Sequence, residues 1–210
     1  MDTESITLKT FCICFAVIML SEIFGPGILA GQWDIFYLPV GILRVWEIFT
    51  ALLLIRFFQG NLRCIGLGKE MLAPGVQKGL IWSAVFGGLV SAAFLILHLS
   101  GTNPLRLFSM RLPRDKNALI VLFTVAVILG PLAEEIIFRG ILYGFFRRWG
   151  IIPAFLLSCS LFVLLHSGFG IVQIIGGILF TLAYEKEKKL MTPVCIHVLG
   201  NAALFFLPLL

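Results

Sequence analysis

The sequence has little charge. Only 13% of its 210 residues are charged, whereas 60% are hydrophobic, and its mean hydropathy is +1.04. Soluble domains carry about 25% charged residues, so this composition excludes a water-soluble globular enzyme. It also excludes an intrinsically disordered chain and a collagen-like repeat. The net charge of +5 is small and lies beside hydrophobic runs, so we expect a lipid bilayer around the protein and no nucleic-acid partner.

Paired cysteines and a signal peptide are also missing. The five cysteines form no CxxC pair, and four lie in hydrophobic runs, where Cys behaves as a small apolar residue. The first five residues, MDTES, are acidic, whereas a signal peptide begins with basic residues. The hydrophobic run after them is too long for a signal-peptide core. We therefore expect no disulfide scaffold and a first hydrophobic run that is retained as a membrane span.

The sequence contains long hydrophobic runs instead. A helix that crosses the roughly 30 Å hydrocarbon core needs about 20 residues, and helices satisfy all their backbone groups within lipid. The sequence thus predicts an all-α polytopic transmembrane bundle of about seven spans, between six and eight, forming a single domain over residues 1–210. The runs cover residues 8–29, 35–58, 80–99, 118–146, 151–166, 169–184 and 191–210.

Three of these runs predict departures from straight spans. The run 118–146 is too long for one straight crossing and contains Gly130-Pro131, so we expect a kink there. The runs 151–166 and 169–184 are short for a crossing. They are either tilted spans or a partly re-entrant pair.

The basic residues favour a cytoplasmic N-terminus. This orientation places ten Lys and Arg residues inside and four outside, in agreement with the positive-inside rule. The four outside lie in the segment 106–116, which opposes the assignment and which we interpret as an interfacial helix. The ten inside are Lys9, Arg56, Arg63, Lys69, Lys78, Arg147, Arg148, Lys186, Lys188 and Lys189.

Charged side chains inside the runs are candidates for function, because each costs about 2.5 to 3.5 kcal/mol to insert. In GPLAEEIIFRG, residues 130–140, Glu135 and Arg139 are four apart and so share one helical face, where they can pair. Glu134 points about 100° away and has no such partner. We interpret Glu135 and Arg139 as support and Glu134 as a candidate general base. A structural ion network of all three residues is an equal alternative.

Three further polar residues lie in two later runs. His166 follows Phe162 on one helical face, and His197 and Asn201 are four apart in HVLGN. The last two need a polar partner across the bundle because Val, Leu and Phe surround them. An interfacial location of His166 and a helix–helix hydrogen bond from the last pair are the structural alternatives.

Charges in the first two runs have a simpler explanation. Arg44 and Glu47 are three apart, so they can pair on the second run, and Glu22 can join them. We interpret this group as structural.

The three motifs EExxxR, FxxxH and HxxxN, in this order on successive hydrophobic segments, resemble the CPBP family. This family comprises the CAAX-prenyl endopeptidases and the bacteriocin-processing or immunity proteins, and is also called the Abi family. The resemblance covers about residues 118–205, which would form the catalytic core region, whereas residues 1–117 match only as hydrophobic spans. It implies a glutamate-dependent intramembrane endopeptidase, multi-pass in the cytoplasmic membrane of a prokaryote. Its substrate would be a membrane protein or a lipid-anchored peptide.

The family resemblance also implies roles for the residues of the three motifs. Glu134 with His166 would bind and activate the attacking water, and His197 with Asn201 would form the oxyanion hole. The residues that would support the site are Glu135, Arg139 and Phe162.

Metal dependence is a separate question. Carboxylates and imidazoles are ligands of Zn²⁺, and a metal-dependent enzyme would use Glu134, His166 and His197. The sequence has no HExxH motif, so we favour a metal-free mechanism without a cofactor.

Two other classes of membrane protein also place polar residues inside spans. A non-catalytic immunity or maturation partner would use the same cluster for binding. A small transporter would use Glu and His to relay protons, but the chain has no paired half-chain repeat of the kind found in many transporters. No loop of the first half carries a substrate signature, and the sequence assigns neither prenylation of the substrate nor an oligomeric state.

Overall fold

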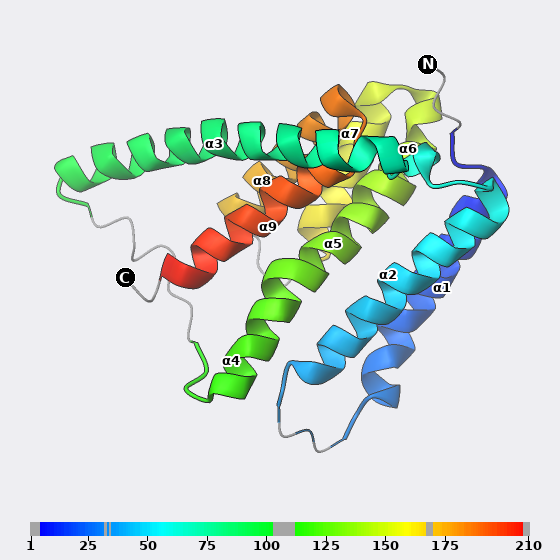
Figure 1. Ribbon diagram of the computed structural model, residues 1–210, viewed down its shortest axis with the longest axis horizontal. Coiled ribbons are helices and arrows are strands. Elements are labelled where there is room, and N and C mark those ends of the chain that lie inside the picture. The colour runs from blue at the N-terminus through cyan, green and yellow to red at the C-terminus, as the bar shows by residue number, and fades with distance from the viewer. Residues whose placement is uncertain (1–4, 32, 34, 103–111, 167–169, 208–210) are drawn as a thin grey trace.

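A computed structural model describes residues 5–31, 33, 35–102, 112–166 and 170–207. Within these ranges all the regular structure is helical (Figure 1). The predicted all-α class is confirmed. The predicted interfacial helix at 106–116 lies mainly outside the described residues.

The first two helices form an antiparallel hairpin along one side of the bundle (Figure 1). They are α1 (Leu8–Ile28) and α2 (Leu38–Gln59). The Thr7 hydroxyl caps α1 by accepting a hydrogen bond from the Thr10 amide at 3.3 Å. Gly60 ends α2 with a φ of 76°, in the left-handed region that glycine adopts at low cost.

The third helix, α3 (Lys69–Leu99), follows the short 3₁₀ turn η1 (Arg63–Ile65) and crosses the bundle over α9 (Figure 1). It begins well before the hydrophobic run 80–99. The hydropathy pattern does not reveal this first part because it contains charged residues. Gly79 permits the close crossing, since a Cβ at this position would lie only 2.4 Å from the Cβ of Cys195.

The central helix runs from Lys116 to Trp149 and changes its hydrogen-bond register several times. One π-helical segment precedes α5 and another follows it, and α5 itself begins with Gly130 and Pro131. The irregularity expected at Gly130-Pro131 thus includes π turns, which occur often at functional sites. The segments are α4 (Lys116–Phe123), η3 (Thr124–Leu129), α5 (Gly130–Glu135), η4 (Ile136–Tyr143), α6 (Gly144–Phe146) and η5 (Arg147–Trp149).

Three helices complete the bundle. They are α7 (Ile151–Leu164), α8 (Ile171–Glu187) and α9 (Met191–Phe206). Helix α8 packs against both α7 and α9, while α9 also contacts α5. The central helix and α7–α9 therefore surround one region of the interior.

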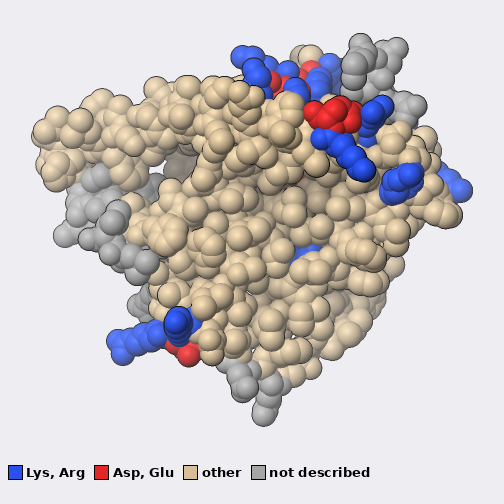
Figure 2. Space-filling view, viewed as in Figure 1, with Lys and Arg blue, Asp and Glu red and all other residues tan. Residues whose placement is uncertain are grey.

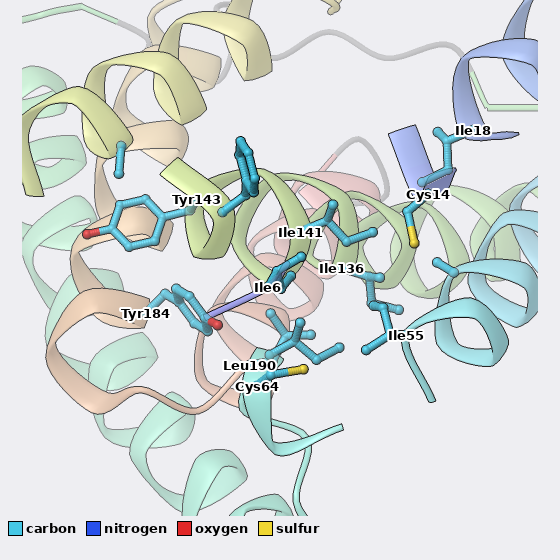
Figure 3. Close-up of a cluster of buried hydrophobic side chains, with 14 of the residues drawn as sticks. Ile6, Cys14, Ile18, Ile55, Cys64, Ile136, Ile141, Tyr143, Tyr184 and Leu190 are labelled. Carbon is cyan, nitrogen blue, oxygen red and sulfur yellow. The ribbon is translucent and has the colours of Figure 1, made fainter. Parts of the chain in front are cut away.

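The helices have the length and surface of an integral membrane protein. In the part of the chain that the structure describes, four helical stretches are long and apolar enough to cross a bilayer, and α7 and α9 are shorter apolar helices. Large apolar side chains face outward, such as Phe57 at 77% exposure, whereas charged side chains gather mainly at one end of the visible face (Figure 2). Figure 3 shows a core in which η4, α8 and the first two helices meet around Ile136, Ile141 and Tyr184.

Candidate functional site

Three polar residues from separate helices meet in the interior. Glu134 lies at the end of α5, His166 just after α7, and His197 in the middle of α9. The Glu134 Oε2 atom is 3.5 Å from His166 Nε2 and 3.8 Å from His197 Nε2. The structure thus brings together three of the four residues for which the sequence predicted catalytic roles.

The neighbouring Glu135 makes the buried ion pair that its spacing predicts. Its Oε1 atom accepts a hydrogen bond from Arg139 Nη1 at 3.0 Å, and both side chains are fully buried. The same oxygen lies 2.8 Å from His197 Nδ1. Glu135 therefore ties the central helix to α9, a link that the sequence reasoning did not include.

Arg139 has further partners on α8. Its Nη2 atom donates to the Gly177 carbonyl oxygen at 3.2 Å and its Nε atom to the Thr181 hydroxyl at 3.4 Å. Its guanidinium also lies 4.5 Å from the ring centre of Phe162 and 5.3 Å from that of Phe180. The four-residue spacing of Gly177 and Thr181 indicates close helix packing, but no sequence signal shows that they bind an arginine.

Backbone and aromatic contacts orient the two imidazoles. His166 Nδ1 lies 2.6 Å from the Phe162 carbonyl oxygen, and that contact requires a hydrogen on Nδ1. A neutral His166 therefore presents an Nε2 lone pair to Glu134. The Phe180 ring stacks on His197 with 4.4 Å between ring centres. Phe162 holds His166 and contacts Arg139, consistent with the expected supporting position, whereas sequence reasoning missed Phe180.

Asn201, the fourth residue with a predicted catalytic role, lies one turn beyond His197 on α9. Its side-chain amide donates a hydrogen bond to the Ala126 carbonyl oxygen in η3 at 2.9 Å. This bond uses one of the two amide hydrogens. Asn201 thus joins α9 to the π turn that precedes Glu134.

The two glutamates differ in their access to the surroundings. The Glu134 and His166 side chains are 24% and 28% exposed, whereas those of Glu135 and Arg139 are fully buried. The Oε2 atom of Glu134 is nevertheless buried and has no hydrogen-bond partner within the described part of the chain. A buried carboxylate oxygen without a partner is costly, and a water molecule beside Glu134 and His166, in contact with both, would satisfy it.

The arrangement of possible metal ligands bears on the metal-dependent alternative. In the ranges that the structure describes, no three His, Cys, Asp or Glu side chains form a group that could hold a metal ion. The carboxylate of Glu134 and the imidazoles of His166 and His197 are groups that can bind Zn²⁺. They are not arranged as a metal-binding group in the structure.

A second intramembrane charge cluster joins α1 to α2. Arg44 Nη1 lies 2.5 Å from Glu47 Oε2 and 2.6 Å from Glu22 Oε1. The Glu47 side chain is fully buried. These contacts agree with the structural pairing expected from the sequence.

The fold and this site together define an all-α integral membrane protein with a glutamate–histidine cluster between its C-terminal helices. Residues 116–203 match the family model described as Rce1-like, type II CAAX prenyl endopeptidase. This match and the relatives below confirm the resemblance to the CPBP family. No solved structure matches the chain at a significant level.

Three curated bacterial proteins are similar to part of the chain. The membrane-embedded CAAX protease MroQ of Staphylococcus aureus is 34% identical over 100 residues, which cover 43% of this chain and 40% of MroQ. The UPF0177 protein YaiF of Lactococcus lactis is 36% identical over 89 residues, covering 40% of this chain and 38% of YaiF. The putative membrane peptidase YdiL of Bacillus subtilis is 30% identical over 88 residues, covering 40% of this chain and 36% of YdiL. The matched stretches thus span well under half the length of each relative.

Proposed function

We propose that this protein is an intramembrane endopeptidase in which Glu134 and His166 activate a water molecule. The observation that carries the proposal is the position of Glu134 Oε2, which is buried without a hydrogen-bond partner among the described residues and lies 3.5 Å from His166 Nε2. Both residues lie in the region 116–203 that matches the endopeptidase family model. Relatives named as membrane peptidases support the same class.

The reaction begins with a water molecule bound beside the two side chains and in contact with both. Glu134 accepts one proton of the water, and the neutral His166 accepts a hydrogen bond from the other hydrogen through Nε2. The water oxygen attacks the peptide carbonyl carbon and forms a tetrahedral oxyanion. When this intermediate collapses, the C–N bond breaks and the proton on Glu134 passes to the leaving nitrogen. A positioned general base contributes on the order of 10² to 10⁴ in rate.

His197 and Asn201 are the proposed donors to the oxyanion. Asn201 offers the second hydrogen of its amide, since the first is donated to the Ala126 carbonyl oxygen. The Nδ1 atom of His197 lies 2.8 Å from the Glu135 Oε1 atom, with which it forms a hydrogen bond. With its proton on Nδ1, a neutral His197 has none on Nε2, so it donates from Nε2 only as an imidazolium. One such donor contributes about 10² to 10³ in rate.

The proposed substrate is a membrane protein or a lipid-anchored peptide. The Glu134 cluster lies on a helix long and apolar enough to span a bilayer, so a soluble peptide would have to enter the membrane to reach it. The name of MroQ, a CAAX protease, supports a substrate that is itself anchored in the membrane. The region that holds the machinery, 118–205, is the proposed catalytic core of a single domain.

The test compares the membrane peptidomes of cells that carry the wild-type chain, Glu134→Ala or His166→Ala at equal expression. Each variant should lose the cleavage products while still inserting and purifying normally. Glu70→Gln is the control, because it removes a carboxylate that pairs with Arg63 at the charged end of the molecule and has no contact with Glu134 or His166 among the described residues. Unchanged products in Glu134→Ala would refute the proposal and favour a non-catalytic immunity or maturation partner.

A chelator tests the metal-free form of the mechanism. The purified protein should retain its cleavage rate after treatment with a strong zinc chelator, because Glu134 and His166 supply the water activation without a cofactor. Loss of activity that added Zn²⁺ restores would overturn the metal-free mechanism and leave the proteolytic function standing.

A further inference from the structure

A cavity of about 180 Å³ opens at the charged end of the molecule, apart from the Glu134 site. Since a water molecule takes up about 30 Å³ of liquid volume, this space holds a phosphate group. Figure 2 shows Lys and Arg side chains gathered at this end. The side chains that line the cavity include four cations and two tyrosines, namely Arg63, Arg147, Arg148, Lys188, Tyr143 and Tyr184.

The charges around this cavity do not balance. Arg63 pairs with Glu70 at 2.8 Å, and Arg147 pairs with Glu185 at 3.0 Å. Lys188 shares Glu185 with Arg147. Among the described residues, four cations therefore face two carboxylates, which leaves two positive charges.

Arg148 is the least compensated of the four. Its guanidinium donates to the backbone carbonyl oxygens of Phe145 and Ile6 and lies 4.1 Å from the ring centre of Phe145. It has no acidic partner among the residues that the structure describes. An anion in the cavity would supply the missing charge.

The cavity lies where a lipid headgroup would be. Arg147 and Arg148 end the helix that crosses the membrane, and the next residue, Trp149, is 59% exposed. Exposed tryptophan at a span end is typical of the membrane–water interface. Basic pockets at this level, on the side that the positive-inside rule makes cytoplasmic, suit the phosphates of anionic lipids.

We propose that this cavity binds the phosphate of an anionic phospholipid headgroup in the cytoplasmic leaflet. The bound phosphate contacts Arg148 and Lys188 and neutralises the excess charge. The site is about 20 Å along the central helix from Glu134, counted at 1.5 Å per residue. It is therefore separate from the proposed active site and does not depend on the proteolytic function.

The test measures lipid binding by the purified full chain in phosphatidylcholine nanodiscs. Phosphatidylglycerol is added in one arm and inorganic phosphate in the other, and affinity is read from the rise in the unfolding midpoint. The double variant Arg148→Gln with Lys188→Asn removes two cavity charges. Asn is chosen at 188 because this residue has a φ of 53°, which asparagine tolerates. Its affinity for phosphatidylglycerol should fall about thirtyfold, the factor expected for two basic contacts at a lipid surface.

The control is Lys9→Gln with Lys69→Gln, which removes the same charge from exposed positions outside the cavity. It should bind phosphatidylglycerol like the wild type. Equal weakening in both double variants would overturn the proposal, because the lipid would then respond to net charge alone. If only inorganic phosphate binds and the cavity variant abolishes this, the lipid assignment is wrong. If the double variant does not fold, Lys188→Asn alone should weaken binding, while Arg148→Lys should preserve it.

Discussion

Glu134 and Glu135 are adjacent in the chain but occupy opposite environments. The Glu135 side chain is fully buried and bound to Arg139 and His197. The Glu134 side chain is 24% exposed, has no ion pair with a described lysine or arginine, and places its Oε2 atom near two imidazoles. The Oε2 atoms of both glutamates lack a hydrogen bond to any described residue, so the difference lies in exposure and ion pairing. One helical step of about 100° separates them. This comparison indicates that Glu135 stabilises the structure, whereas Glu134 is available to act as the proposed general base.

The largest expected effect is the loss of stability when the ion pair of Glu135 with Arg139 is removed. Arg139→Met should lower the free energy of unfolding by about 3 to 5 kcal/mol, because it leaves the buried Glu135 carboxylate without its cationic partner. Glu134→Gln should leave the free energy of unfolding close to the wild-type value, since no ion pair with lysine or arginine is lost. Denaturant titration of both proteins in detergent micelles measures the difference. Equal destabilisation by the two substitutions would contradict the division between the glutamates.

The next effect concerns the proposed oxyanion donor. Asn201→Ala should slow cleavage by about 10² to 10³, while the lost helix–helix hydrogen bond costs only about 0.6 kcal/mol of stability. The cleavage rate in vesicles, measured with a product-forming substrate from the peptidome comparison, checks this. Ser83→Ala is the control, because the Ser83 hydroxyl makes only a local bond to the Gly79 carbonyl. A normal rate in Asn201→Ala would reduce Asn201 to a link between α9 and η3.

Local spacing was sufficient to predict one part of the site. The four-residue interval between Glu135 and Arg139 predicts their ion pair, and the structure confirms it at 3.0 Å. The approach of Glu134 to His166 and His197 depends on how three separate helices pack. No spacing within one helix contains that information, so only the family resemblance indicated it.

Other parts of the structure could not be predicted from hydrophobic patterns. The start of α3 at Lys69 was missed because Lys69, Glu70 and Lys78 lower the local hydropathy. The π turns were missed because they depend on which carbonyl each amide reaches, and residue periodicity does not specify this. The contact of Thr181 with Arg139 was missed for a third reason, since a threonine on an apolar helix commonly bonds its own backbone, as Thr181 also does.

The smallest expected effect concerns the ion pair of Arg147 with Glu185, compared with the buried pair of Arg139 with Glu135 on the same central helix. Arg147 and Glu185 pair at 3.0 Å at the charged end, where both side chains are partly exposed. Partial burial raises the pKa of Glu185, but hydrogen bonds from Arg147, Lys188 and Tyr143 outweigh it and lower the pKa to about 2. The pKa shift alone would correspond to about 3 kcal/mol. Because both side chains are partly exposed and water screens the pair, Glu185→Gln should cost only about 1 kcal/mol at neutral pH.

The pH dependence of that small loss distinguishes the exposed pair from the buried one. A glutamate in the unfolded chain titrates near its ordinary pKa of 4.5, so the contribution of Glu185 is complete above that pH and is lost as the pH falls toward 2. The difference in unfolding free energy between wild type and Glu185→Gln should therefore be constant from about pH 6.5 to 8, two units and more above the ordinary pKa, and shrink in acid. Arg147→Gln should follow the same trend, and the double variant should show the coupling between them. A difference that persists unchanged into acid would mean that Glu185 acts through packing, in which case its role would resemble that of the buried Glu135.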